Sequence, residues 1–206
     1  EGERDRMMGL IAVVVAILVG GIPFGLFVVR LKSGKDVREH GSGNIGATNV
    51  LRTSGTAAGV ITLALDAAKG LFAVWLADTL THGDVFWMSA TALAVLLGHA
   101  FSPYLKFKGG KSVATFLGAF GYLTPVPVLV VLLIFILVVA TTRYLSLGSI
   151  TGAALFPFAC FIILHPEWPV LVAALGAGVL IVWRHAGNIE RIRAGNERVL
   201  RFGKHS

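Results

Sequence analysis

A short polar segment between two apolar stretches alternates glycine with small hydrogen-bonding side chains. Residues 42–49 read SGNIGATN, and an arginine follows where the next apolar stretch begins. Glycine lets backbone amides approach an anion closely, and a helix that starts after such a loop directs unpaired N–H groups at it. We therefore predict an anion site from these residues: Ser42, Gly43, Asn44, Thr48, Asn49 and Arg52. An ordinary polar loop with turn residues is the alternative that composition leaves open.

A second segment, residues 98–115, reads GHAFSPYLKFKGGKSVAT and places two glycines and a lysine at the start of an apolar helix. Its GGKS part is similar to a nucleotide-binding loop, but that motif needs a glycine five residues before Gly110, where this chain has Leu105. We reject a nucleotide site and keep a phosphate site at a helix N-terminus. Its expected residues are His99, Gly109, Gly110, Lys111 and Ser112. Lys106 and Lys108 are explained by anchoring at the membrane surface.

A third segment, residues 184–197, reads RHAGNIERIRAGNE and is too polar for a bilayer. His185 and Asn188 are three residues apart, so they share one face of a helix, and Glu197 follows. A basic helix resting on anionic lipid is the alternative, and it explains Arg193, Arg198 and Arg201 but not the histidine and the asparagine.

Three smaller features complete the set. Ser146 and Ser149 follow Arg143 in a polar turn, where the alternatives are capping a helix and contacting a phosphate. Asp66 and Lys69 lie three residues apart inside an apolar stretch, and mutual neutralisation is the favoured interpretation. The single cysteine, Cys160, excludes an intrachain disulfide, and no cluster has metal-ligand spacing, so we expect no metal.

The elements that must position these residues are membrane-spanning helices. Of the 206 residues 55% are hydrophobic and only 14% are charged, with a mean hydropathy of +0.79, which excludes the usual soluble and disordered classes. A span needs about 20 apolar residues. The polar breaks give seven spans, at about 9–30, 56–77, 86–105, 111–124, 126–142, 148–164 and 169–183. Residues 112–142 form one helix kinked at Pro125 and Pro127 in the alternative interpretation.

The distribution of positive charge selects seven spans and an orientation. With seven, all but Arg4, Arg6 and Lys69 of the 18 lysines and arginines fall on one side, Lys204 included, which the positive-inside rule makes the cytoplasmic side. The N-terminus is then outside and the C-terminus cytoplasmic. The net charge of +7 therefore belongs to membrane topology rather than to nucleic-acid binding. Residues 1–7 are interpreted as an N-terminal extension or an expression remnant, and residues 8–206 as one membrane-embedded domain.

The three polar segments, together with LDAAKG at residues 65–70, resemble the bacterial acyl-phosphate:glycerol-3-phosphate acyltransferases. The matching motifs are SGNIGATN, GHAFSPYLKFKGGK and HAGNI with the downstream GNE. The resemblance implies a multi-pass enzyme of the bacterial inner membrane with its active site on the cytoplasmic face. It implies transfer of a fatty acyl group from acyl phosphate to the sn-1 hydroxyl of glycerol 3-phosphate, which gives lysophosphatidic acid and phosphate. No cofactor, nucleic acid or protein partner is expected, and the chain is expected to be a monomer.

The acyl phosphate is already activated, so the enzyme must mainly hold two polyanions together and stabilise developing charge. We expect Ser42, Gly43, Lys111 and the amides of Gly109 and Gly110 to hold the acyl phosphate head. Glycerol 3-phosphate then falls to Arg52, Ser149, His185 and Asn188, and the acyl chain to the apolar faces of the spans. The expected catalytic residues are Ser42, Lys111, His185 and Asn188.

The proton acceptor stays open between three candidates. His185, His99 and an oxygen of a substrate phosphate can each take the proton of the glycerol hydroxyl, and we favour the substrate oxygen. A transporter of a phosphorylated metabolite is the competing function, because it needs the same cationic pocket. Clustering of the charges on one side, without a visible internal repeat, disfavours it, and a purely structural subunit leaves the polar motifs unexplained.

Overall fold

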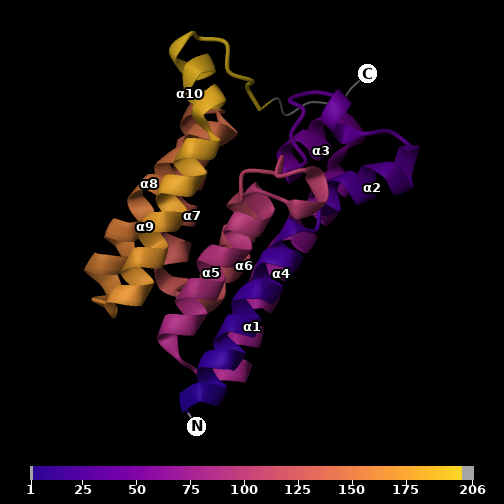
Figure 1. Cartoon of the computed structure of the whole chain (residues 1–206). Coiled ribbons are helices and arrows are strands. Elements are labelled where there is room, and N and C mark those ends of the chain that lie inside the picture. Colours follow the sequence, from indigo (N-terminus) through magenta and orange to yellow (C-terminus); the bar gives the residue numbers. More distant parts are fainter. Residues whose placement is uncertain (1, 201–206) are drawn as a thin grey trace.

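The computed structural model describes residues 2–200, in which all regular structure is helical (Figure 1). The α-helices are α1 (Gly2–Gly21), α2 (Phe24–Ser33), α3 (Ala47–Ser54), α4 (Thr56–Thr81), α5 (Val85–Ala100), α6 (Val113–Leu123), α7 (Pro125–Thr142), α8 (Leu145–Leu164), α9 (Trp168–Arg184) and α10 (Ala186–Arg193). Two 3-10 turns, η1 (Val37–Glu39) and η2 (Pro103–Leu105), lie in the loops. Arg201 and Lys204 of the basic tail lie outside the described residues.

Five helical stretches of the described chain are long and apolar enough to cross a membrane. They are Gly2–Ser33, which contains α1 and α2, then α4, Val85–Leu105, α7 and α8. A sixth arises when α9 and α10, which are bent by 54°, count as one broken span. The shorter α6 has only 11 residues. The sequence is therefore right about an all-helical membrane protein. Helix length and composition identify five or six spans in the described chain, and the count of seven stays a prediction.

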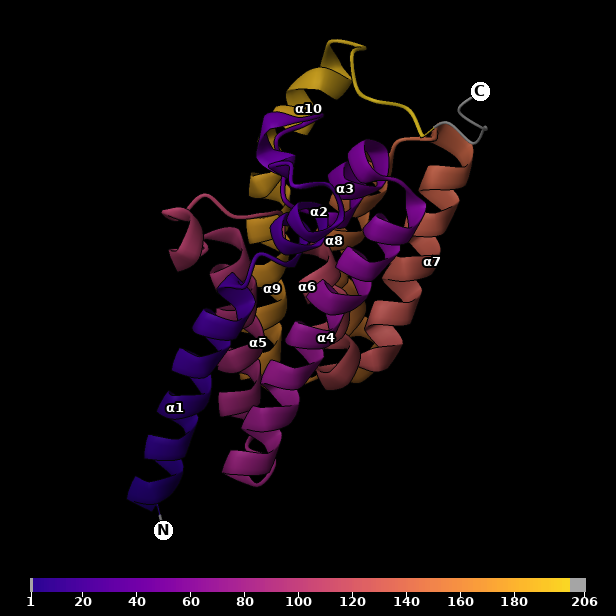
Figure 2. The same cartoon turned by 90° about the vertical axis from the view of Figure 1, so that its right-hand side faces the viewer.

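The helices form an elongated bundle with a polar end. Figures 1 and 2 show the N-terminus at one end of the bundle, and α2, α3 and α10 at the other. We call the latter the polar end. The loop at residues 101–112, the second of the three polar segments, begins at the same end, where α5 finishes beside α1. The polar residues singled out in the sequence are thus gathered at one end of an otherwise apolar bundle.

Close approach of α4 and α6 holds the centre of the bundle together. A Cβ atom on Gly70 would lie 2.2 Å from the carbonyl oxygen of Thr115, and one on Gly118 would lie 1.8 Å from that of Ala67. Only glycine permits such contact, and small residues at helix interfaces are the usual means of close packing in membranes. This pair fixes the start of α6, and with it the residue that precedes the helix, Lys111.

The chain reverses between α6 and α7. α6 starts two residues after Lys111, at the polar end, and the residue that caps α7, Arg143, accepts a hydrogen bond at its carbonyl from the amide of Leu200 at the same end. Thr124 and Pro125 form the turn, where proline starts a new helix without needing an N–H partner. Residues 112–142 are consequently two antiparallel helices, and the kinked single helix is wrong.

Candidate active site

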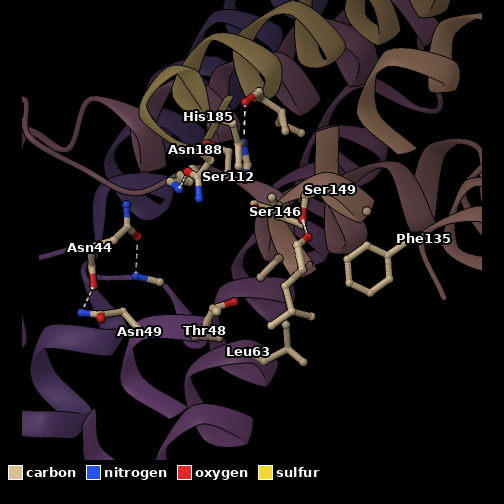
Figure 3. A pocket seen from close by; sticks show the side chains of 18 of the residues that line it. Asn44, Thr48, Asn49, Leu63, Ser112, Phe135, Ser146, Ser149, His185 and Asn188 are labelled. Carbon is tan, nitrogen blue, oxygen red and sulfur yellow. Dashed lines mark hydrogen bonds between the residues drawn. The ribbon is translucent and has the colours of Figure 1, made fainter. Parts of the chain in front are cut away.

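A cavity of about 430 Å³ opens at the polar end between α3 and α4 on one side and α6 to α10 on the other (Figure 3). All three polar segments contribute to its wall. The predicted residues that line it are Ser42, Asn44, Thr48, Asn49, Arg52, His99, Lys111, Ser112, Ser149, His185, Asn188 and Glu197. Gly43, Gly109 and Gly110 are predicted residues that do not line it. Convergence of segments 140 residues apart is what a single site for two phosphates requires.

The first polar segment is shaped by one buried side chain, Asn49. Its Oδ1 accepts from the amide of Ser42 at 2.8 Å, and its Nδ2 lies 2.9 to 3.2 Å from three backbone carbonyl oxygens. These carbonyls belong to Val37, His40 and Asn44. With 2% of its surface exposed and its polar atoms occupied, Asn49 holds the loop rather than a substrate. The sequence identified the residue correctly but not this role.

This loop can bind an anion through two groups, the hydroxyl of Ser42 and the N-terminus of α3. Ser42 is exposed and lines the cavity, while its own amide is occupied by Asn49. Ala47 and Thr48, the first residues of α3, lie in the cavity wall, where helix N-termini attract anions. The amide of Gly43 donates to the carbonyl of His40 at 3.1 Å, so the structure does not support its predicted contact with phosphate.

The amides of Gly109 and Gly110 do not point at a ligand, contrary to the prediction. They donate to the carbonyls of Ala100 and His99 at 3.1 and 3.0 Å. A Cβ on Gly109 would lie 2.0 Å from the carbonyl oxygen of His99, so glycine serves close packing here. This backbone pairing turns the loop so that the next residue, Lys111, reaches the cavity.

Lys111 is the cation at the centre of the site. Its ammonium donates to Oδ1 of Asn188, and burial, together with the positive charge of Arg191, lowers the pKa of Lys111 to about 8. The negative charge of Glu197 opposes that shift. The adjacent Ser112 is buried, and its hydroxyl donates to the carbonyl of Leu96 at 2.8 Å, so it anchors α6 to α5.

Glu197 is a buried residue that holds two other side chains of the third segment in place. Its Oε1 accepts from Nδ2 of Asn188 at 2.9 Å, and its Oε2 accepts from Nε of Arg191 at 2.9 Å. Burial alone would raise the pKa of this carboxyl, but the hydrogen bond from Asn188 and the charge of Arg191 hold it below its ordinary value. An ionised carboxylate repels phosphate, so Glu197 acts here by orienting Asn188. Its direct contact with substrate stays a prediction.

His185 presents one ring nitrogen to the cavity. Its Nδ1 lies 2.7 Å from the carbonyl oxygen of Ile181, which can only accept, so Nδ1 carries the hydrogen. In the neutral ring Nε2 is then free to accept a hydrogen bond. The carbonyl rather than a carboxylate orients this histidine. Figure 3 shows His185 and Asn188 on the same side of the cavity.

Two serines on the first turns of α8 have different roles. The hydroxyl of Ser149 donates to the carbonyl of Leu145 at 3.0 Å, one turn earlier in α8, so Ser149 does not cap the helix, whose N-cap residue is Tyr144. Ser146 is buried beside the Glu197 carboxylate, whose pKa it helps to lower. Both serines line the cavity.

Comparison with known proteins identifies the family. A sequence profile described as glycerol-3-phosphate acyltransferase matches residues 10–195 of this chain. The chain belongs to this family. The glycerol-3-phosphate acyltransferase of Geobacter sulfurreducens is 48% identical over 91% of this chain and 95% of its own length. The enzyme of the same name from Trichlorobacter lovleyi is 47% identical over 92% and 96%.

Solved structures agree. The crystal structure of PlsY, an integral membrane glycerol 3-phosphate acyltransferase, in its glycerol 3-phosphate form is 38% identical, with a TM-score of 0.88 over 94% of this chain and 96% of that chain. Its lysophosphatidic acid form is 36% identical, with a TM-score of 0.85 over 94% and 95%. The resemblance inferred from the three motifs is thus confirmed.

This glycerol-3-phosphate acyltransferase family member also contains a buried ionic cluster that spacing could not reveal. Nζ of Lys69 lies 2.7 Å from Oδ1 of Asp66, 2.9 Å from Nδ1 of His99 and 2.8 Å from the carbonyl oxygen of Ile22. The predicted pairing of Asp66 with Lys69 is confirmed. An ammonium only donates, so Nδ1 of His99 accepts and Nε2 carries the hydrogen. Nε2 of His99 therefore cannot act as a base toward the cavity, because it already carries the hydrogen.

The other half of the cavity is apolar and lies deeper in the bundle. Leu63 of α4, Leu117 of α6, Phe135 of α7 and Gly152 of α8 line it. Figure 3 shows Leu63 and Phe135 beside the two serines of α8. A polar end that adjoins an apolar chamber fits a molecule with a charged head and a hydrocarbon chain.

The segment after α10 runs back across the polar end (Figure 1). Nη2 of Arg198 donates to the carbonyl of Gly41 at 2.9 Å, and Nη2 of Arg52 donates to the carbonyl of Arg198 at 3.4 Å. The amide of Leu200 then donates to the carbonyl of Arg143 at 2.8 Å. This segment, residues 194–200, thereby ties the loop before α3 to the turn before α8.

Proposed function

We propose that this chain transfers a fatty acyl group from acyl phosphate to the sn-1 hydroxyl of glycerol 3-phosphate and releases lysophosphatidic acid and inorganic phosphate. The observation that carries the proposal is the single cavity that joins Lys111, His185 and Asn188 to an apolar chamber. Family membership supports the same acceptor. The apolar chamber supports a donor with a long chain.

The acyl phosphate head binds at Ser42, the start of α3 and Lys111. Among the described residues the ammonium of Lys111 donates to a neutral amide oxygen and to no carboxylate, so a phosphate oxygen can replace that contact without breaking an ion pair. Glycerol 3-phosphate binds beside it, with Arg52 as the cation and His185 and Asn188 as hydrogen-bonding partners. Two polyanions are thereby held together, which supplies most of the catalysis for an activated donor.

In the reaction, the sn-1 oxygen forms a bond to the acyl carbon, and the bond from that carbon to the phosphate oxygen breaks. The hydroxyl proton passes to the departing phosphate, so no charge accumulates on a side chain. Nε2 of His185 accepts the hydroxyl hydrogen bond and orients it. A backbone carbonyl, not an acid, holds the other nitrogen of this ring, which favours orientation over proton storage.

The active site faces the cytoplasm of the bacterial inner membrane, and the chain crosses that membrane seven times with its N-terminus outside. The clustering of basic residues around the polar end supports this orientation. α6 is about 16 Å long at 1.5 Å per residue, shorter than a ~30 Å hydrocarbon core. It still counts as a crossing, because α6 begins at the polar end and α7 returns to that end at Arg143. The chain acts as a monomer without a protein partner.

A reconstituted assay tests the function. Purified protein in detergent is mixed with palmitoyl phosphate and glycerol 3-phosphate, and lysophosphatidic acid and phosphate are measured. Equal amounts of both products are expected with wild-type protein, and none with Lys111→Ala. Glycerol 3-phosphate flux into sealed vesicles without product would instead favour a transporter. Phosphate release at the wild-type rate by Lys111→Ala would contradict the placement of Lys111.

A further inference from the structure

Arg184, the last residue of α9, binds the backbone immediately before Lys111. Its Nε donates to the carbonyl of Gly110 at 2.9 Å, and its Nη2 donates to that of Gly109 at 2.8 Å. The guanidinium also lies 5.8 Å from the centre of the Phe101 ring, at the other end of the same loop. Arg184 is half-buried and is not among the residues that line the cavity.

The two glycines are held from two helices at once. Their amides donate to the end of α5, at the carbonyls of Ala100 and His99, while their carbonyls accept from α9. All four backbone polar groups of the pair are therefore occupied. The His99 ring packs on Gly110, where a Cβ would lie 2.1 Å from its Nε2. The backbone at residue 111 consequently has little freedom.

We propose that Arg184 is a positioning residue for Lys111: its two parallel hydrogen bonds fix the loop that aims the Lys111 ammonium into the cavity. Arg184 precedes His185 at the bend between α9 and α10. This bend therefore positions both the loop that carries Lys111 and the ring of His185. The proposal rests on the acyl transfer described above. It assigns Arg184 no contact with either substrate.

The planar fork of the guanidinium matters for this role. A lysine at position 184 keeps the positive charge but cannot donate two hydrogen bonds in parallel to adjacent carbonyls. A glutamine removes the charge as well. The charged groups that face Lys111 are Arg52 of α3, Arg184, Arg191 of α10 and Glu197, and each arginine lowers the pKa of Lys111. Geometry and charge can therefore be separated by two substitutions at one position.

The test compares Arg184→Lys and Arg184→Gln with wild type, using Arg193→Lys and Arg193→Gln on the exposed face of α10 as matched controls. We expect Arg184→Lys to lower kcat/KM at least tenfold without moving the alkaline limb of the pH profile. Arg184→Gln should lower it as much and move that limb to higher pH. A merely structural residue would change the yield of folded enzyme and leave the pH profile in place. Both controls should stay within twofold of wild type.

A second measurement does not depend on turnover. The rate at which an N-hydroxysuccinimide ester acetylates Lys111, followed by mass spectrometry across pH, reports the titration of this amine. The midpoint should rise in Arg184→Gln and stay in Arg184→Lys, whether or not the protein makes lysophosphatidic acid. Wild-type kcat/KM in folded Arg184→Lys, or an unmoved acetylation midpoint in Arg184→Gln, overturns the proposal. If Arg184→Gln does not fold, Arg184→Lys decides alone.

Discussion

The ammonium of Lys111 donates a hydrogen bond to Oδ1 of Asn188, and the same amide donates from Nδ2 to the Glu197 carboxylate. Asn188 is thus held in one orientation by a cation on one side and an anion on the other. Its oxygen, not its nitrogen, faces the cation. This arrangement aims the Lys111 ammonium, and within residues 2–200 no carboxylate pairs with it directly, so its positive charge is available for phosphate.

The activity should fall as the pH rises through about 8. The pKa of Lys111 is lowered to about 8, so the ammonium is charged below that pH and loses its proton above it. The pH profile of kcat/KM reports the free enzyme and should show this alkaline limb. Lys111→Arg keeps its charge and should lose the limb, at a reduced rate. A wild-type profile that stays flat to pH 10 would contradict the assignment.

Replacing Glu197 by glutamine should lower kcat/KM about tenfold, because a charge-assisted hydrogen bond contributes roughly 1.5 kcal/mol or more. The alkaline limb should also move to lower pH, since the carboxylate raises the pKa of Lys111. Glu190→Gln, on the exposed side of α10, is the control and should change neither quantity. A limb that moves to higher pH would mean that Glu197 does not act on Lys111.

His185→Gln separates orientation from proton transfer. If the substrate phosphate takes the proton, the variant should lose about ten- to a hundredfold in kcat while its acidic limb stays, because that limb belongs to the substrate. If Nε2 of His185 is the base, the acidic limb should vanish with the imidazole. Burial and the positive charge of Lys111 lower the pKa of His185 to about 4, so the limb of a histidine base lies near pH 4. The kcat profile must therefore extend below pH 4 to distinguish these results.

Gly152 should set the length of the acyl chain. A Cβ there would meet only the carbonyl oxygen and Cβ of Val131, at 3.4 and 3.9 Å, in the wall of the apolar chamber. Gly152→Leu should therefore shift kcat/KM from palmitoyl toward decanoyl phosphate by at least tenfold. Gly121→Leu on α6, where a Cβ has no neighbour within 4 Å, is the control. An unchanged ratio in Gly152→Leu would place the chain elsewhere.

Breaking the buried ion pair should destabilise the bundle. Asp66→Asn leaves Lys69 as an unpaired buried charge, which costs roughly 3–5 kcal/mol. The double variant Asp66→Leu with Lys69→Met removes both charges and should recover most of that free energy of unfolding. Thermal unfolding in detergent measures both. A single variant as stable as wild type would show that the pair contributes nothing.

Much of the site could be predicted because small polar residues have no other reason to occur in an apolar chain. The types and spacing of the polar residues predict the three segments, and these segments meet in one cavity. The lengths of the apolar runs likewise predict an all-helical membrane protein. The count of seven spans stays a prediction, because α6 has only 11 residues and its apolar run merges with the start of α7.

The incorrect predictions concern backbone amides that already donate hydrogen bonds within the protein. Whether the amide of Gly109 is free depends on the turn that precedes it, where Lys106 and Phe107 adopt left-handed φ values of 51° and 62°. No residue type there indicates such a turn. The pairing of Lys69 with His99 spans 30 residues, which no local spacing encodes. The sequence placed Glu197 at the site but did not predict its hydrogen bonds with Asn188 and Arg191.

The segment that runs from α10 back to Arg143 has a consequence for synthesis. The cavity needs the contact of Arg198 with Gly41, which joins the first quarter of the chain to its last, and the contact of Glu197 with Asn188. A nascent chain that has already inserted every helix up to α9 still lacks these walls. The nascent enzyme should therefore be inactive until residues 184–200 have left the ribosome. Incomplete chains in the membrane should then not consume acyl phosphate.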